Sequence, residues 1–388
     1  MSNSVQVPEA AVPPAGGRRG FGGYLAGIAA VTGLEMRQRL RSRGWYIMLA
    51  IWFVIIGGVT ALTWLSWSSQ NSPGGDFGTI DGGISAPGSL IFEIVLAFVL
   101  FFALLVAPAF SANAVNGDRA GGTLAILQVT LLRPGQILWG KFLASWLAGL
   151  AFLVASVPFL VFAILLGGLG AGHILVALLM LAVEVGVVCA VGVGVSALAN
   201  RPLFSIVVTY LLVAALGLGT LIAFGLGALV TQGTTPANQV YYKGQGQVTG
   251  LEPAPPADIT DQNSEYACYG PLTEQPAIHT ERIAWLLAMN PFVVVADAIP
   301  YRAPAAQDES PTGIFELISQ GARAAEAGPA ATTQCANGRV SAAYLSQTTP
   351  LWPLGLGLQL LVTAILLALG WRALRTPARK LATGTRVA

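Results

Sequence analysis

The sequence predicts an all-α polytopic membrane protein with six transmembrane helices, cytoplasmic N- and C-termini, and a large polar external domain between the fifth and sixth spans. The composition is 54% hydrophobic and only 10% charged, and the Lys and Arg residues are segregated along the chain. Six apolar runs are each long enough for the ~20 residues that cross hydrocarbon. The runs are Trp45–Trp67, Ser89–Phe110, Ile137–Leu166, His173–Leu198, Pro202–Leu229 and Leu351–Trp371.

The distribution of cations sets the orientation. Fifteen of the chain's twenty Lys and Arg residues fall on one side when the spans are threaded alternately, and the opposite loops 68–88 and 167–172 contain none. Because cytoplasmic flanks retain Lys and Arg, we expect a multi-pass protein of a bacterial plasma membrane with this side inside. The fifteen cations are Arg18, Arg19, Arg37, Arg39, Arg41, Arg43, Arg119, Arg133, Lys141, Arg201, Arg372, Arg375, Arg379, Lys380 and Arg386.

The composition changes along the chain and predicts a series of consecutive parts. Residues 1–19 lack periodicity and predict a disordered leader, whereas 20–44 combine apolar residues with four Arg, typical of an amphipathic helix that contacts lipid at the inner leaflet. The remaining parts are spans one to five in 45–230 with an inner loop at 113–136, an extracellular domain in 231–350, the sixth span in 351–372 and a basic cytoplasmic tail in 373–388.

The extracellular domain holds two of the three cysteines. Cys268 and Cys335 lie in an oxidising place, which predicts a disulfide between them; two unpaired thiols are the alternative. Cys189 lies in the fourth span and is expected to be a small buried residue. Near the end of the domain, Ile283–Ile299 is almost apolar, but a seventh span would carry the basic tail outside. We therefore expect an amphipathic or surface-lying helix in the external region, with a break or kink at Pro291.

Small residues in the spans predict close helix packing. Most of the paired glycines are best explained by packing within one chain. The fifth span contains four of them and is the better candidate for a subunit interface: Gly217, Gly219, Gly225 and Gly227.

The sequence contains no constellation for catalysis or metal binding. His173 and His279 lie in different segments, and H-E-x-x-H and C-x-x-C are absent. Residues 135–142 imitate a phosphate loop, but Phe142 lacks the magnesium-binding hydroxyl and the segment runs into a membrane helix. We expect no cofactor in this chain, no ATP hydrolysis by it and no nucleic-acid partner. Lys141 is then an interfacial cation that Arg could replace.

Two carboxylates lie within apolar runs. Glu184 is near the middle of the fourth span, where a carboxylate is costly unless it faces a polar cavity, is protonated or bonds to a neighbouring helix. A place on a substrate path and a purely structural hydrogen bond both fit. Glu93 is near the outer end of the second span, where we expect water to reach it.

The inner loop is the most informative segment. Asp118, Arg119 and the Gly121-Gly122 pair form a polar turn ahead of a short apolar stretch. Leu124, Leu127 and Leu131 share one face of the predicted helix. Such a helix favours a groove on a partner protein, although passive contact with the lipid interface is an alternative.

Here the chain resembles the permease subunits of ATP-binding-cassette exporters of the second export type, which include drug and polysaccharide exporters. The resemblance covers about residues 20–375 and includes Asn290-Pro291-Phe292 ahead of the last span. Ala120, Gly121 and Ala125 depart from the pattern. The residues that match it in order are Arg119, Gly122, Thr123, Leu124, Leu127, Pro134, Gly140 and Lys141.

The resemblance implies two partners: a nucleotide-binding ATPase subunit, which holds ATP and magnesium, and a second permease chain, identical or related. The implied function is export of an amphiphilic substrate of drug, lipid or glycan type. The main alternative is a non-transporting component that transmits ATPase motion to an envelope partner; a secondary transporter is disfavoured because no repeated halves are found. The implied ATPase-coupling residues are Asp118, Arg119, Gly122, Thr123, Leu124, Leu127, Leu131 and Pro134.

Overall fold

The computed structural model of the chain describes residues 20–70, 87–122, 132–167, 170–243, 256–263, 265–300, 313–345 and 349–375. Six helical stretches in these ranges are long and apolar enough to cross a membrane, as predicted. The predicted leader 1–19 and most of the tail 373–388 lie outside the described residues. The six are α2 (Arg43–Gln70), α3 (Pro87–Ser111), α6 (Pro134–Leu165), α7 (Ala171–Leu198), the fifth span from Pro202 to Val230, and α16 (Trp352–Leu374).

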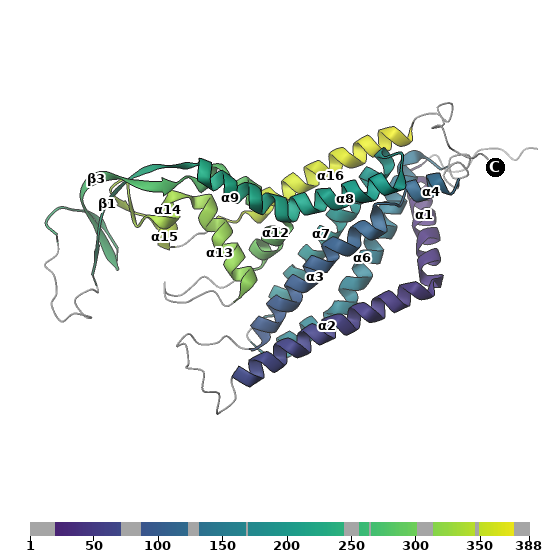
Figure 1. Cartoon of the computed structure of the whole chain (residues 1–388), viewed down its shortest axis with the longest axis horizontal. Helices are drawn as coiled ribbons and strands as arrows, with labels where there is room; N and C mark the ends of the chain where they lie inside the picture. Colours follow the sequence, from purple (N-terminus) through teal and green to yellow (C-terminus); the bar gives the residue numbers. More distant parts are fainter. Residues whose placement is uncertain are drawn as a thin grey trace, which may run out of the picture.

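Helix α1 (Phe21–Arg41) corresponds to the predicted interface helix. Ser42 has an extended backbone (φ −81°, ψ 124°) and separates α1 from α2, so α1 turns across one end of the bundle (Figure 1). Val31 is buried, whereas Phe21 and Leu34 are exposed. Contact of these exposed apolar side chains with lipid stays a prediction.

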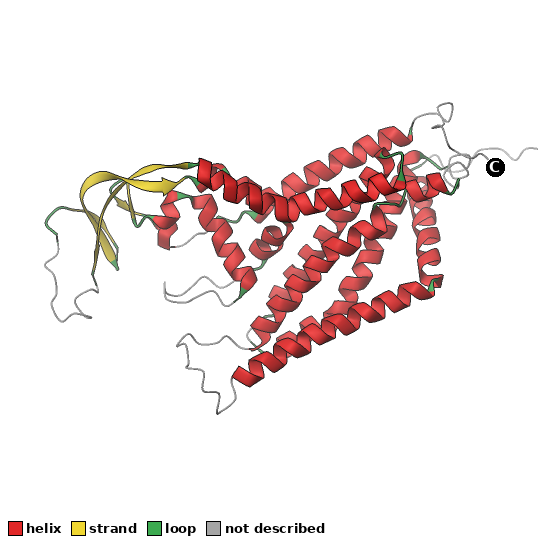
Figure 2. Cartoon of the chain, in the orientation of Figure 1, coloured by secondary structure: helices red, strands yellow, loops and turns green. Residues whose placement is uncertain are grey.

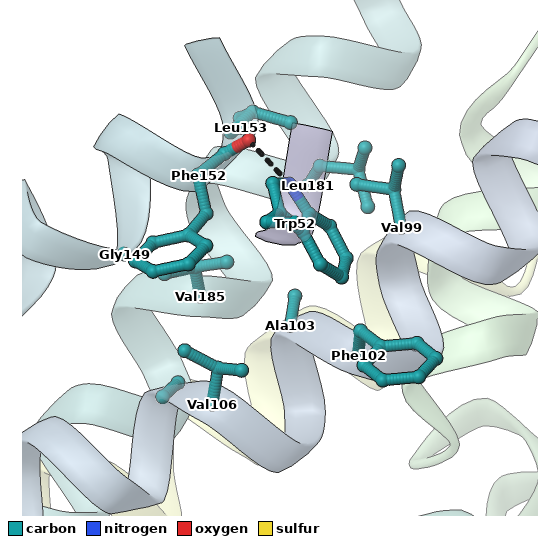
Figure 3. A pocket seen from close by; sticks show the side chains of 11 residues that line it. Trp52, Val99, Phe102, Ala103, Val106, Gly149, Phe152, Leu153, Leu181 and Val185 are labelled. Atoms are coloured by element: carbon teal, nitrogen blue, oxygen red, sulfur yellow. Dashed lines mark hydrogen bonds between the residues drawn. The ribbon is translucent and has the colours of Figure 1, made fainter. Parts of the chain in front are cut away.

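Helix α7 occupies the centre of the bundle. It packs against α3, α6 and α16. Of its most apolar 18-residue stretch, 67% is buried, compared with 17% of the corresponding stretch in the fifth span. The fifth span therefore leaves most of its apolar surface uncovered by this chain. Within the core, Trp52 Nε1 donates to Phe152 O at 3.0 Å, beside an apolar cavity of only about 20 Å³ (Figure 3).

The fifth span contains one turn of π-helix. Helix α8 (Pro202–Ala214) passes into the π segment η1 (Ala215–Gly219) and then into α9 (Thr220–Val230). The Asn290 amide donates to Gly217 O at 2.6 Å and to Thr220 Oγ1 at 3.0 Å. A single π turn inside an α-helix often marks a functional position, and here it receives a side chain from a distant segment.

The expectation of a surface-lying helix at 283–299 is wrong. The segment forms two short helices, α11 (Ala284–Ala288) and α12 (Pro291–Ala298), with Asn290 capping α12 through a bond from Phe292 N. The predicted break at Pro291 is confirmed. Helix α12 is buried among α7, α13 (Ile314–Ala327) and α16, which explains its apolar composition without a seventh span.

Two carboxylates anchor this region to the bundle. Asp297 is 1% exposed and accepts bonds from Ser319 Oγ, Arg323 Nε and the backbone N–H groups of Leu351 and Trp352. Glu93 on α3 is 3% exposed and accepts from Phe315 N at the start of α13. The expectation that water reaches Glu93 is therefore wrong, because α13 covers it.

The all-α prediction is also wrong, since a five-stranded antiparallel sheet lies between α9 and α16 (Figure 2). Strands β1 and β3 pair from Gln232↔Ile278 to Tyr242↔Tyr266, with a register shift between Ala237 and Gln239. The sheet order is β2-β3-β1-β4-β5. The strands are β1 (Gln232–Tyr242), β2 (Ile259–Gln262), β3 (Tyr266–Ile278), β4 (Cys335–Ala336) and β5 (Arg339–Val340).

The predicted pairing of Cys268 with Cys335 is present as a disulfide. It joins β3 to β4, which also contacts β1 through Ala237↔Ala336. Both sulfurs are buried beside Tyr266. Short helices complete the region: η2 (Thr280–Arg282), α14 (Pro329–Thr332) and α15 (Ala342–Leu345). Cys189 is buried in α7, as expected.

Candidate functional site

The candidate site lies at the end of the bundle opposite the sheet (Figure 1). Helix α1, the short helix α4 (Asn116–Ala120), the first turns of α6 and the last turn of α7 meet there. Pro134 begins α6 at a position where its missing N–H costs no hydrogen bond. We call this group of elements the α1–α4–α6 junction.

Lys141 is at the centre of the junction. Its ammonium lies 2.6 Å from Glu35 Oε1 on α1 and 2.6 Å from Asp118 Oδ2 on α4. The Lys141 side chain is 1% exposed, whereas those of Glu35 and Asp118 are 22% and 25% exposed. A buried cation needs counter-charges, so Lys141 ties α1 and α4 to α6. The interpretation of Lys141 as an interfacial cation is wrong.

Arg119 attaches α4 to the end of α7. Its guanidinium donates to Ala199 O at 2.6 Å and to Ala197 O at 3.0 Å, the carbonyls left free where a helix ends. A cation at a helix C-terminus also interacts favourably with the helix dipole. At the other end of α4, Ser196 Oγ accepts from the backbone N–H groups of Val115 and Asn116. Helix α4 is thus held to α7 at both ends.

Helix α1 packs tightly against α6. A Cβ at Gly140 would lie 2.6 Å from Val31 Cβ and 3.2 Å from Ile28 O, so only glycine allows this approach. Thr32 Oγ1 donates to Gly140 O at 3.2 Å. Gln136 Nε2 donates to the carbonyls of Gly23 and Tyr24. These contacts attach α1 to the first turns of α6.

Arg39 extends the junction to α3. Its Nη2 donates to Phe110 O at 3.2 Å, and the guanidinium lies 5.2 Å from the Phe110 ring centroid. Burial lowers the pKa of Arg39, and the neighbouring Glu35 carboxylate opposes that shift. Glu35 thus interacts electrostatically with two cations, Arg39 and Lys141.

The structure brings together part of the predicted coupling set. Asp118 and Arg119 face α6 and α7, and Gly122 takes the left-handed backbone that favours glycine (φ +73°). Thr123, Leu124, Leu127 and Leu131 lie outside the described residues, so the helix predicted for them stays a prediction. The sequence reasoning missed Glu35, although it is the single acidic residue in the Arg-rich segment 20–44.

Glu184 lies apart from the junction, on α7. It is fully buried, and neither of its carboxylate oxygens accepts a hydrogen bond within the described ranges. Gln359 of α16 lies beside it, and Gln359 Oε1 is likewise unpartnered there. Glu184 lines neither the cavity beside Trp52 nor a larger apolar groove between α6 and α16. Its place on a substrate path therefore stays a proposal.

The described residues show neither a phosphate loop nor a metal cluster. Residues 135–142 are helical throughout as part of α6, so the imitation of a phosphate loop makes no cradle. No group of three or more His, Cys, Asp or Glu side chains gathers in the described ranges.

Comparison with known proteins identifies one family. The family model described as "ABC-2 family transporter protein" matches residues 29–373, a range that includes all six candidate spans except the last residue of α16, and 13 of the 21 residues of α1. No curated protein matches the chain.

Proposed function

Since the chain belongs to the ABC-2 family of transporter proteins, we propose that it is the permease subunit of an ATP-binding-cassette exporter. The match over residues 29–373 is the observation that carries this proposal. Six candidate spans form the membrane path. A separate ATPase subunit binds ATP and magnesium and hydrolyses the ATP. An amphiphilic substrate of drug, lipid or glycan type suits such a path.

The proposed orientation places the α1–α4–α6 junction in the cytoplasm and the sheet outside. The two lie at opposite ends of the bundle (Figure 1), and Arg39 from the basic segment 20–44 belongs to the junction. The disulfide between Cys268 and Cys335 supports an oxidising surrounding for the sheet.

The junction supports a coupling role. An ATPase that moves α4 and the segment 123–131 would act on α6 through Lys141 and Asp118, and on α7 through Arg119. It would act on α1 through the ion pair of Lys141 with Glu35. One contact surface could thus move two central helices together.

The fifth span is the proposed contact with a second permease chain. Leu211 and Leu218 are 63% and 64% exposed, and a Cβ at Gly217 or Gly225 would meet nothing within 4 Å. Small residues beside exposed apolar ones suit close approach of another helix.

A second function is favoured by the sheet. Strands β1 and β3 extend beyond the helices (Figure 2), and such a projection suits contact with an envelope protein. In that case the chain transmits ATPase motion without moving substrate.

Purification with its ATPase tests the proposal. We expect the pair to co-purify and a transported amphiphile to stimulate ATP hydrolysis. Stimulation only by an envelope protein would support the second function, and failure to retain any ATPase would contradict both. Orientation is tested separately by labelling single cysteines at positions 245 and 384 in intact cells with an impermeant maleimide. Position 245 should react and position 384 should not.

A further inference from the structure

A long apolar groove runs between α6, α7 and α16. Its volume is about 600 Å³, within the ~300–1,000 Å³ of ligand pockets. Its walls are rich in aromatic side chains, and the lining includes Trp139, Trp146, Val187, Leu360, Ala364 and Trp371. None of the described lining residues is acidic. We call this feature the α6–α16 groove.

The groove opens to the side of the bundle. Trp139 and Leu360, from its two rims, are 43% and 48% exposed. Both rims belong to candidate membrane spans, so the surrounding medium is lipid. Acyl chains are the apolar material available to fill such a groove.

One end of the groove carries cations. A Cβ at Gly135 would lie 2.5 Å from Tyr24 Oη and 3.4 Å from Trp371 Nε1, so α1, α6 and α16 converge there. Arg375 stacks over the Trp371 ring, with Cζ 3.4 Å from its centroid. Arg372 lies in the last turn of α16, and both Arg residues are exposed. Trp and Tyr at this end suit the headgroup level of a bilayer.

We propose that the α6–α16 groove binds an anionic phospholipid of the bilayer. One acyl chain lies along Ala364 and Leu360, and the phosphate meets Arg372 and Arg375. Basic pockets between membrane helices attract anionic headgroups. This charge complementarity favours a phospholipid over a second copy of the chain. The bound lipid is a resident ligand, distinct from any transported substrate.

Native mass spectrometry of the full chain tests the proposal. The protein is incubated in mixed micelles with equal amounts of phosphatidylglycerol and phosphatidylcholine that have the same acyl chains. The wild type should retain phosphatidylglycerol in preference. Arg372→Gln with Arg375→Gln should lower that preference by about fivefold for each cation removed, and the double Lys variant should keep it. Arg41→Gln with Arg43→Gln, also exposed, is the charge control.

A second variant tests the groove itself. Ala364→Trp fills it without changing charge and should lower retention of both lipids. Ile365→Trp is the control, since Ile365 is 51% exposed on the same helix but lies outside the lining. Equal retention of the two lipids by the wild type, or wild-type retention by Ala364→Trp, would overturn the proposal. Conversion of a dimer to monomers by Ala364→Trp, with lipid retention unchanged, would assign the groove to a second copy instead.

Discussion

Lys141 of α6 and Glu35 of α1 form an ion pair with an Nζ–Oε1 distance of 2.6 Å, and the lysine side chain is almost completely buried. The two residues are 106 positions apart. Asp118 is the second counter-charge, so three separate segments share one ammonium group. The carboxylates of Glu35 and Asp118 are partly exposed and remain in contact with solvent, whereas the ammonium of Lys141 is buried.

This difference in burial between the lysine and its two carboxylates predicts the effect of removing the carboxylates or the lysine. Glu35→Gln with Asp118→Asn leaves a buried ammonium without a counter-charge and should destabilise the protein by about 3–5 kcal/mol. Adding Lys141→Met to these changes should restore much of the loss. Lys141→Arg should be poorly tolerated, because a larger guanidinium must fit the same buried site. Thermal unfolding in detergent measures all four proteins, and an unaffected double variant would show that the ion pairs are unimportant.

The apolar face of segment 123–131 should hold the ATPase. Leu124→Asp with Leu127→Asp removes two large apolar side chains, worth roughly 1.5–3 kcal/mol each if fully buried in the contact. We expect an inserted permease that loses its ATPase on purification. The matched control is Leu272→Asp with Leu317→Asp, which changes exposed leucines of β3 and α13. Normal retention of the ATPase by the first pair would remove this segment from the interface.

The disulfide should be a major stabilising element of the sheet. Its sequence separation is 67, and closing such a loop contributes about 4 kcal/mol in the chain-entropy model. Cys268→Ser with Cys335→Ser should therefore open β1 and β3 to limited proteolysis. Cys189→Ala, which leaves the bridge intact, is the control. Intact mass of the wild type before and after reduction should differ by two hydrogens, and two free thiols in the unreduced protein would contradict the bond.

Asp297 should hold the end of the bundle next to the sheet together. Asp297→Asn exchanges one accepting oxygen for a donor that faces other donors, in a site 1% exposed. An unsatisfied buried partner costs about 1–3 kcal/mol. Relative to the wild type, the sensitivity of α13 to protease should therefore increase more than that of α6. Asp258→Asn, at an exposed position, should leave the digestion pattern unchanged. Equal protection of α13 in both variants would argue against the role of Asp297.

Glu184→Gln tests the proposed substrate path. Glutamine keeps the shape of the side chain and removes the carboxylate, so folding and assembly should be preserved. Substrate-stimulated ATP hydrolysis should fall if Glu184 faces substrate during transport, with Glu265→Gln in the sheet region as control. Unchanged stimulation would leave Glu184 as a purely structural group where α7 packs against α16.

The membrane class and the six spans were readable from the sequence because each span is a continuous apolar run, and this property needs no knowledge of neighbours. The break at Pro291 was also readable, since proline lacks the N–H that an uninterrupted helix requires. The cysteine pair in a polar segment was sufficient to predict the disulfide. Within the coupling set, Arg119 was selected by its place in the motif, and the structure shows it bonded to the end of α7.

Contacts between distant segments were decided only by the tertiary structure. The strands β1 and β3 are partly exposed and polar, and they pair from Tyr242↔Tyr266 to Gln232↔Ile278, residues 24 to 46 positions apart in the sequence. No local sequence pattern predicts this pairing. Helix α12 is apolar because α7, α13 and α16 surround it, not because it lies on a surface. The surroundings of Lys141 were also decided by distant segments. Its position in the sequence suggested a membrane-interface cation, but in the fold α1 and α4 surround it. A charge can be buried there only because Glu35 and Asp118 arrive from other segments to compensate it.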